Sequence, residues 1–401
     1  MIFNVILGAA FGKRIMKKML EKLTGDRLII VIFLIYLGIS GIVSTLFLMR
    51  KYIYNENFDS EYTSDMGDKL EADYNSVFLG KQHYINLNGL CGRLFGETEI
   101  NGVTKLRNGY LTVIDSDSNT DIVIENANSV IGLNDYLNGK GIELIYVIAP
   151  STVSKYDSQL PAGITDYTNY KLDVFAENLK RSENINLIDL REEMFNDGID
   201  QYKLFYKTDH HWNVRGGLYA AQKIVERIED ICGEKLDKEM LNIENYNIEE
   251  YKKWHLGSRG QRVGRFFAGI DDFEIMYPKF YTEIERKSDK ATGTFKDVFI
   301  CYDALKNKDY ASRYTYDTTY KYSIENSFIN SKAPSSKRLL VLTDSMGRVV
   351  NPYLALEFNE LDGIVYETVN QKLIDEIKPD VMIILLHPGN VFERDYFEFD
   401  V

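Results

Sequence analysis

The sequence RLLVLTDSMG, residues 338–347, runs from an apolar segment directly into a turn that carries a serine. The RLLVL part predicts a strand that is buried on both faces of a parallel sheet, and residues 346–358 predict a helix after it. Ser345 is therefore expected at a strand-to-helix turn. There a hydroxyl projects from the sheet edge, and the next backbone N–H groups can bind an oxyanion. The alternative is that Asp344 or Ser345 only caps the helix.

Similar segments recur along the chain. Strands are predicted at residues 142–149, 185–190, 363–367 and 380–386, and helices at 129–138, 170–179 and 216–231. Strands separated by helices are typical of a three-layer α/β fold with a mostly parallel central sheet. In such sheets the reacting groups gather at the carboxyl ends of the strands.

Two regions depart from this pattern. Residues 74–113 are rich in glycine and aromatic residues, which predicts short strands and turns. Residues 234–335 are dense in lysine, aspartate and tyrosine and show little periodicity. We expect an irregular insertion or a loosely patterned subdomain there.

An uncharged run of 22 residues, Leu28 to Met49, predicts a transmembrane helix. At about 1.5 Å per residue, a helix of this length crosses the ~30 Å hydrocarbon core of a membrane. Six basic residues precede the run and two follow it, so the N-terminus should stay in the cytoplasm and the rest should lie outside. The alternative is a cleaved signal peptide, whose apolar core is normally shorter and ends at small residues.

The formal charge of −13 argues against a nucleic-acid-binding protein. Residues 1–51 carry eight basic and two acidic side chains, a net +6, so the remainder carries −19. This asymmetry fits an acidic body behind a basic anchor. The predicted organisation is a basic cytoplasmic segment at 1–27, a transmembrane helix at 28–49, a juxtamembrane stalk at 50–74 and an extracytoplasmic domain at 75–401.

The pentapeptide TDHHW, residues 208–212, places a carboxylate, two imidazoles and an indole together in a chain with five histidines and two tryptophans. In an extended segment, Asp209 and His211 point the same way. The carboxylate can then hold one imidazole nitrogen and leave the other free as a base. The alternatives are an aspartate satisfied by local hydrogen bonds, with the histidines packed beside Trp212, and a metal site.

The other possible metal ligands are scattered. The cysteines lie far apart without a C-x-x-C pair, so a structural zinc site is not expected, and whether two of them form a disulfide stays open. The histidines outside TDHHW have no chelating spacing. The sequence therefore predicts no metal and no cofactor. The scattered residues are Cys91, Cys232, Cys301, His83, His255 and His387.

The chain resembles the DHHW family, which is similar to the alginate O-acetyltransferase-type (AlgX/AlgJ-like) branch of the SGNH hydrolase superfamily. The resemblance rests on TDHHW followed by N-x-x-G-G and extends from about Tyr74 to the C-terminus. Weaker markers follow in the expected order. They are LGK at 79–81, RNGYL at 107–111, APS at 149–151, LP at 160–161, LGS at 256–258, RVG at 262–264 and TDS at 343–345.

The resemblance implies an SGNH-like fold and a role for each motif residue. Ser345 would be the nucleophile, His211 the base and Asp209 the carboxylate that orients it, which are also the roles that a serine hydrolase or transferase needs. Thr343 stands where the family's G-D-S motif has its glycine. Loop geometry or a salt bridge is the alternative for most of the oxyanion and substrate candidates. Those candidates are Gly347, Gly257, Ser258, Arg262, Asn390, His210 and Trp212, the last two expected to support the catalytic pair.

The apolar run and the resemblance together imply a single-pass membrane protein whose extracytoplasmic domain transfers an acetyl group to a cell-surface polysaccharide through an acetyl-serine. The resemblance also implies a multi-spanning membrane-bound O-acyltransferase as the acetyl donor. One alternative is a carbohydrate acetylesterase with the same residues. The other is a non-catalytic envelope protein that binds polysaccharide or serves as a scaffold.

Overall fold

The computed structural model describes residues 25–54, 73–74, 77–182, 185–310, 315–365, 369–393 and 397–401. The chain divides into two compact units, Met1–Tyr84 and Ile85–Val401, and each is described by itself. Most of the predicted cytoplasmic segment and most of the predicted stalk lie outside the described residues. The predicted division of the chain into four parts therefore stays a prediction.

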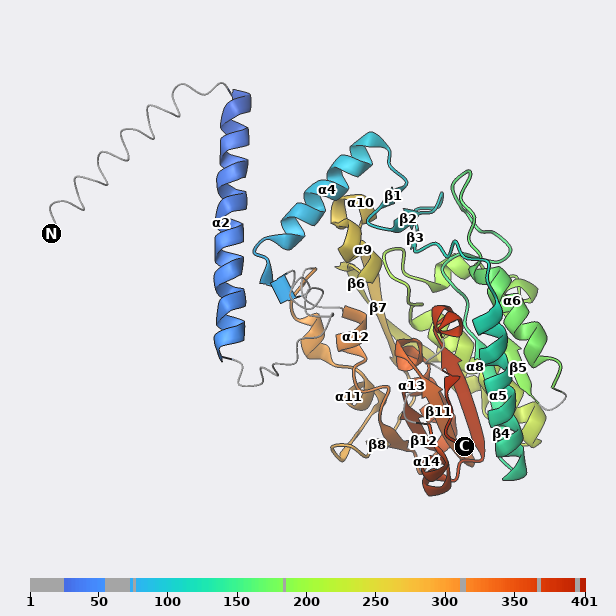
Figure 1. The fold of residues 1–401 in the computed structure, drawn as a ribbon. Helices are drawn as coiled ribbons and strands as arrows, with labels where there is room; N and C mark the ends of the chain where they lie inside the picture. The colour runs from blue at the N-terminus through green and yellow to red at the C-terminus, as the bar shows by residue number, and fades with distance from the viewer. Residues whose placement is uncertain are drawn as a thin grey trace. The chain divides into compact units, whose positions relative to one another are not determined.

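The smaller unit contains one long helix, α2 (Gly25–Tyr54) (Figure 1). Its segment Ile29–Arg50 has a mean hydropathy of 2.5 and is long and apolar enough to cross a membrane. Isoleucine, leucine and phenylalanine side chains remain exposed along it, as expected of a surface that faces lipid rather than water. The helix is compatible with a single-pass anchor and with a signal sequence.

An eight-stranded mixed sheet forms the centre of the larger unit (Figure 1). The first five strands in its spatial order are parallel, and the last three pair antiparallel. The order is β5 (Asn186–Asp189), β4 (Glu143–Ile148), β13 (Val381–Leu386), β11 (Ser335–Thr343), β12 (Phe358–Ile364), β10 (Ser327–Ile329), β8 (Ile284–Arg286) and β9 (Ala291–Gly293).

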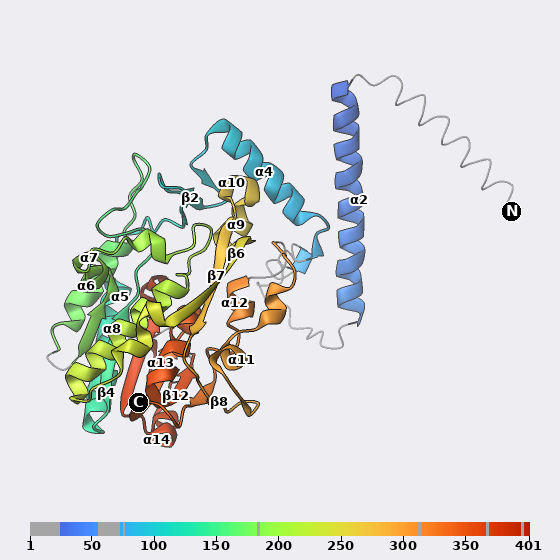
Figure 2. The same ribbon diagram turned by 180° about the vertical axis from the view of Figure 1, so that it is seen from behind.

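Helices cover both faces of this sheet, so the predicted three-layer α/β fold is confirmed (Figures 1 and 2). Side chains of β11 alternate between two buried clusters: Leu340 and Leu342 belong to one, Leu339 and Val341 to the other. This alternation is the period of two that a strand buried on both faces requires. One cluster includes α5 (Asp121–Gly139) and α6 (Thr168–Leu179), and the other includes α8 (Val214–Cys232) and α13 (Asn351–Glu357).

Helix α8 begins directly after the TDHHW segment. The Asn213 side chain caps it by accepting hydrogen bonds from the backbone N–H groups of Arg215 and Gly216. A Cβ atom at Gly217 would lie 2.1 Å from the Val349 carbonyl oxygen, so only glycine allows this close approach to the turn that follows Ser345. The sequence after TDHHW thus packs the two predicted motifs against each other.

The region expected to be an irregular insertion, 234–335, contributes more order than predicted. Its strands β8, β9 and β10 extend the central sheet, while β6 (Tyr246–His255) and β7 (Asp271–Pro278) form a separate antiparallel pair. The short strands and long connections gave little periodic signal. The remaining elements there are η2 (Lys238–Leu241), η3 (Ile243–Asn245), α9 (Ser258–Val263), α10 (Arg265–Ala268), α11 (Phe295–Phe299), η4 (Tyr302–Leu305) and α12 (Thr315–Thr319).

Four predicted elements differ from the structure. The helix predicted at 129–138 is α5, which begins earlier, at Asp121. The helix predicted at 346–358 is divided into η5 (Ser345–Val349) and α13, because Pro352 favours a new helix start. The strand predicted at 363–367 is β12, which begins earlier and pairs with β11 from Phe358 onward.

The fourth difference lies in the region 74–113, where a helix, α4 (Lys81–Phe95), precedes the expected short strands. A Cβ at Gly89 would lie 2.1 Å from the Val263 carbonyl oxygen. Glycines that allow such close packing weakened the helical signal. The strands are β1 (Glu99–Ile100), β2 (Val103–Lys105) and β3 (Leu111–Thr112), and the elements not yet given are α7 (Leu190–Asn196), η1 (Gln201–Leu204), α14 (Gln371–Ile377) and η7 (Pro388–Phe392).

Candidate active site

Ser345 lies at the first position of η5, immediately beyond the carboxyl end of β11. The turn is tight: a Cβ at Gly347 would lie 2.4 Å from Thr343 Oγ1. Thr343 itself is buried and donates its hydroxyl to the Leu385 carbonyl of the neighbouring strand at 2.7 Å. A threonine is thus accommodated where the family pattern has glycine, because its side chain finds a partner inside the sheet.

His211 faces Ser345 directly. The Nε2 atom of His211 lies 2.7 Å from Ser345 Oγ, within reach for transfer of the hydroxyl proton. The imidazole is 3% exposed and stacks on the ring of Tyr316, with centroids 4.2 Å apart. The Tyr316 hydroxyl donates to the Ser345 carbonyl oxygen at 3.0 Å, so one tyrosine holds both residues.

Asp209 lies behind His211. Its Oδ1 atom is 3.2 Å from His211 Nδ1, although the approach is too bent for a good hydrogen bond. The segment 207–211 forms bends rather than the extended strand expected from the sequence. An antiparallel bridge between Phe205 and Trp212 closes this loop and keeps the carboxylate and the imidazole together.

The Asp209 carboxylate is buried, and both of its oxygens accept hydrogen bonds. Oδ2 lies 2.8 Å from His255 Nε2, and Oδ1 accepts the His210 backbone N–H at 2.8 Å and the Ser258 hydroxyl at 3.0 Å. Burial disfavours the charge, but nearby His211 and hydrogen bonds from the surrounding histidines outweigh it, and the pKa of Asp209 lies well below its usual value. The carboxylate is therefore ionised at neutral pH.

The second aspartate, Asp344, ties the serine turn to the end of β13. Its Oδ2 atom accepts the His387 backbone N–H at 2.6 Å and the Asn390 side-chain amide at 2.8 Å, and its Oδ1 atom accepts the Met346 N–H at 2.8 Å. Burial raises the pKa of this carboxyl despite these donors. Asn390 therefore donates to Asp344 in this structure.

The backbone amide of Ser345 is the best-placed oxyanion donor. It makes no hydrogen bond to another residue in the described part of the chain. The Gly347 N–H, in contrast, donates to the Asp344 carbonyl oxygen at 3.1 Å and forms the η5 turn. The two amides expected to share this role, those of Gly347 and Asn390, are thus both engaged inside the protein.

The remaining predicted residues fall into two groups. Gly257 and Ser258 lie against Asp209, and a Cβ at Gly257 would be 2.3 Å from Asp209 Cβ. Arg262 is placed elsewhere, because its guanidinium donates to the Asn101 carbonyl oxygen at 2.9 Å in a surface contact. The buried Arg259, three residues earlier, contacts the site instead. Its guanidinium donates to the Asp209 carbonyl oxygen at 3.3 Å.

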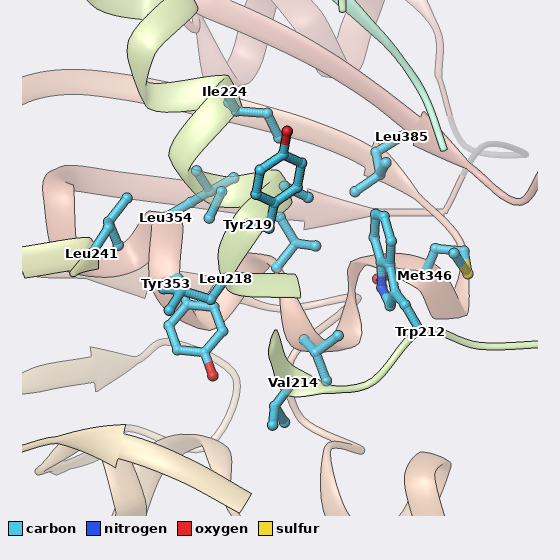
Figure 3. Close-up of a cluster of buried hydrophobic side chains, with 14 of the residues drawn as sticks. Trp212, Val214, Leu218, Tyr219, Ile224, Leu241, Met346, Tyr353, Leu354 and Leu385 are labelled. Atoms are coloured by element: carbon cyan, nitrogen blue, oxygen red, sulfur yellow. The ribbon is translucent and has the colours of Figure 1, made fainter. Parts of the chain in front are cut away.

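His210 and Trp212 pack against the neighbours of His211 and Ser345. The His210 ring stacks on His211 with centroids 3.8 Å apart, and its Nδ1 lies 2.8 Å from Ser258 Oγ. Trp212 is fully buried, and its indole N–H donates to the Met346 carbonyl oxygen at 3.0 Å. Figure 3 shows the indole beside Met346 and Leu385. Trp212 thus joins the histidine loop to the serine turn.

Three residues of the site were not predicted. His255 precedes the Leu256-Gly257-Ser258 marker by one residue, so its position next to a recognised motif was an available signal. Arg259 follows the same marker. Tyr316 lies in α12, within the region without clear periodicity, and nothing in the sequence distinguishes it from the other tyrosines.

The site also holds a cluster of side chains of the kinds that bind metals. Asp209, His210 and His211 offer ligand atoms within 4.8 Å of one another. However, both carboxylate oxygens already accept hydrogen bonds from protein donors, and His211 Nε2 faces Ser345. A cation would have to displace these partners, so the residues fit proton transfer better than metal binding.

Residues 112–296 match the family model ALGX, described as an SGNH hydrolase-like domain, acetyltransferase AlgX. Residues 112–296 of the larger unit are therefore similar to an SGNH hydrolase-like domain, and the α/β fold is SGNH-like. The predicted resemblance to the DHHW and AlgX/AlgJ-like group is thereby confirmed. The matched range includes Asp209 and His211 but ends before Ser345, so the assignment of the serine rests on geometry.

Solved structures share the fold of the larger unit. Bacillus cereus PatB1 with a sulfonyl adduct has a TM-score of 0.60 at 18% identity, covering 76% of this chain and 99% of PatB1. A second PatB1 structure gives 0.59 at 20% identity, covering 73% and 98%. A DHHW family protein from Eubacterium siraeum gives 0.52 at 14% identity, covering 74% and 94%. At these identities the likeness shows the fold alone. No curated protein sequence matches the chain.

Proposed function

We propose that this protein is a membrane-anchored serine O-acetyltransferase that acetylates a cell-envelope polysaccharide through an acetyl-Ser345 intermediate. The observation that carries the proposal is the 2.7 Å approach of His211 Nε2 to Ser345 Oγ, with the ionised Asp209 behind the imidazole. The AlgX-type family model supports the acetyl-transfer chemistry. In this account Ser345, His211 and Asp209 form the catalytic triad.

In the first half-reaction, Ser345 Oγ attacks the carbonyl carbon of the acetyl donor. His211 Nε2 accepts the hydroxyl proton, and the carbonyl oxygen becomes an oxyanion that the Ser345 N–H stabilises. When the bond to the leaving group breaks, His211 returns that proton to it. Asp209 stabilises the imidazolium that exists between these steps.

In the second half-reaction, a sugar hydroxyl takes the place of the leaving group. His211 removes the proton of the sugar hydroxyl, whose oxygen attacks the acetyl-serine carbonyl carbon. The ester bond to Ser345 Oγ then breaks, and His211 protonates Oγ. The products are an O-acetylated sugar and the free serine, so the enzyme is ready for a second cycle.

The anchor fits this chemistry. Helix α2 would hold the domain at the extracytoplasmic surface of the cell membrane. There a multi-spanning membrane-bound O-acyltransferase would present exported acetyl groups. The basic residues before the apolar run support a cytoplasmic N-terminus. The donor protein and the orientation are parts of the proposal.

Two other functions use the same fold. A carbohydrate acetylesterase would pass the acetyl group to water rather than to a sugar. A non-catalytic polysaccharide-binding or scaffold protein would not need a histidine in contact with the serine, and the hydrogen-bonded pair favours an enzyme. The experiment below separates all three functions.

The full-length protein in detergent is incubated with 4-nitrophenyl acetate, with and without a mixture of uncharged oligosaccharides. We expect slow hydrolysis by the wild type and formation of O-acetylated oligosaccharide when sugar is present. Ser345→Ala should abolish both reactions, while Ser336→Ala, a change of an exposed serine on the same strand, should leave them intact. A chelator should not reduce either rate.

Equal turnover by the wild type and Ser345→Ala would exclude the serine mechanism. Hydrolysis that depends on Ser345, but never yields an acetylated sugar, would identify an esterase. Loss of activity on chelation, restored by a divalent metal, would favour the metal alternative at Asp209, His210 and His211.

A further inference from the structure

A cavity of about 410 Å³ opens in the larger unit at residues that the proposed chemistry does not use. One wall comes from residues 154–157, which follow β4, and the other from residues 191–202, which follow β5. Neither Ser345 nor His211 lines it. Because β4, β5 and β11 are parallel members of one sheet, the cavity lies at the same edge of the sheet as the serine.

The cavity is also close to the active site along that edge. In the sheet order, β4 is two strands and β5 is three strands from β11, which corresponds to about 10–15 Å at the usual strand spacing. Gln201 in the cavity wall donates to the Ser151 carbonyl oxygen at 2.6 Å. The next residue, Thr152, accepts a hydrogen bond from Arg259, which donates also to the Asp209 carbonyl oxygen. The cavity wall is thus bonded to the catalytic loop.

A flat aromatic surface lines the cavity. The rings of Tyr156 and Phe195 stack with centroids 3.8 Å apart and planes 18° apart. They remain 45% and 55% exposed, respectively. The Tyr156 hydroxyl donates to Glu192, which fixes the ring. An exposed, fixed pair of this kind presents an apolar face to which the C–H face of a pyranose ring can pack.

The charged groups of the cavity are predominantly acidic. Asp157 and Asp200 are exposed carboxylates, and neither forms an ion pair with another described residue. The one guanidinium, that of Arg191, is already bound by Asp189 at 2.6 Å and by Asp173 at 2.9 Å. Carboxylates can accept hydrogen bonds from sugar hydroxyls but repel an acidic sugar.

We propose that this cavity is a subsite for an uncharged pyranose unit of the acceptor polysaccharide, while another unit of the same polymer lies at Ser345. The inference rests on the proposed function and narrows it. The acceptor would be a polysaccharide with neutral sugars at this position, and a polyuronate would be excluded. Tyr156 and Phe195 would supply the packing surface, and Asp157 and Asp200 the selection against charge.

Calorimetric titration of the full-length protein in detergent tests the subsite, with cellopentaose and chitopentaose as uncharged probes and pentagalacturonate as the anionic one. We expect both uncharged probes to bind more tightly than the uronate. Phe195→Ala should weaken their binding by about three- to tenfold, the range expected for loss of one aromatic contact. Tyr281→Ala, which removes a 72% exposed ring outside the cavity, is the matched control and should change nothing.

Replacing both carboxylates, Asp157→Asn with Asp200→Asn, should lower the Kd for pentagalacturonate and so bring it closer to the Kd for the uncharged probes. Unchanged binding by Phe195→Ala, or a uronate that binds as tightly as the uncharged probes, would overturn the subsite. The rate of 4-nitrophenyl acetate hydrolysis by the wild type and by Ser345→Ala keeps the two proposals separate, because it is measured without any oligosaccharide. If binding depends on Phe195 but hydrolysis does not depend on Ser345, the catalytic proposal fails and the sugar subsite stands.

Discussion

Three imidazoles converge on the carboxylate of Asp209. His210 Nδ1, His211 Nδ1 and His255 Nε2 lie 3.1, 3.2 and 2.8 Å from its oxygens. The negative charge of the ionised carboxylate favours a proton on each nitrogen that faces it, including His211 Nδ1, whose approach is bent. For His211 this leaves Nε2 unprotonated toward Ser345, which is the tautomer that a general base requires.

His255 is, in this account, a positioning residue that acts through Asp209. It is fully buried and does not contact Ser345. We expect His255→Phe to lower kcat for ester hydrolysis by about ten- to hundredfold, because an unsatisfied buried acceptor costs about 1–3 kcal/mol. The KM should change little, since the side chain does not touch the substrate.

The conservative variant His255→Gln can still donate to Asp209 and should recover part of kcat. Measuring kcat and KM for both variants, with thermal melting as the check on folding, decides the matter. If kcat falls equally in both variants and only in proportion to a lower melting temperature, the role of His255 is purely structural.

Among the helices and strands, the sequence predicted the two strands that carry the site. It did not predict the helices whose boundaries depend on tertiary packing. RLLVL and DVMIILL are continuous apolar runs, so they predicted β11 and β13 closely. Helix α4 and the helix break before α13 were missed, because glycines used for close packing and a proline at a helix start distort the periodic signal.

The same limit applies to the site. Ser345, His211 and Asp209 were named from their motifs, and the structure brings them together. Asn390 and Gly347 have partners that could not be foreseen, since Asp344 binds both through tertiary or turn hydrogen bonds. Contacts between segments far apart in the chain leave no local pattern.

Helix α13 ends in a buried acid, Glu357. Its Oε2 atom accepts the Asp237 backbone N–H at 3.3 Å, and Oε1 is buried without a hydrogen-bond partner among the described residues. Burial raises the pKa of Glu357 to about 8, with the charges of Asp237 and Glu229 adding to the rise. The unfolded chain releases this proton at lower pH, so stability should fall as pH rises from about 4.5 toward about 8.

We therefore expect Glu357→Gln to have little effect on thermal stability at about pH 5, where the folded acid is protonated. At about pH 9 the variant should be more stable than the wild type by about 1–3 kcal/mol, the usual cost of an uncompensated buried polar group. Melting curves of both proteins at the two pH values measure this. Glu376→Gln, on an exposed glutamate of α14, serves as the control, and an equal gain at both pH values would contradict the account.

At the scale of the whole molecule, the basic N-terminal segment and the acidic body predict an anchored protein with its domain outside the cell. A C-terminal alkaline phosphatase fusion, which is active only outside the cytoplasm, should be active. A green fluorescent protein fusion at the same end should not fluoresce after export. We expect the full-length protein to stay in the membrane fraction after alkaline extraction, because the proposed anchor would retain its apolar helix.

A shorter, soluble product would instead indicate that residues 28–49 are removed as a signal sequence. A fluorescent fusion with no phosphatase activity would reverse the orientation. Either result would separate the domain from the proposed acetyl-donor partner, and the reaction would then need a soluble donor.

Peptide mass spectrometry of the protein, quenched in acid during turnover of 4-nitrophenyl acetate, shows whether Ser345 carries the acetyl group. We expect one acetyl group on the peptide that contains Ser345, absent from Ser345→Ala and greatly reduced in His211→Ala. An acetyl group found only on another residue, or turnover with no acetylated peptide at any time, would contradict it.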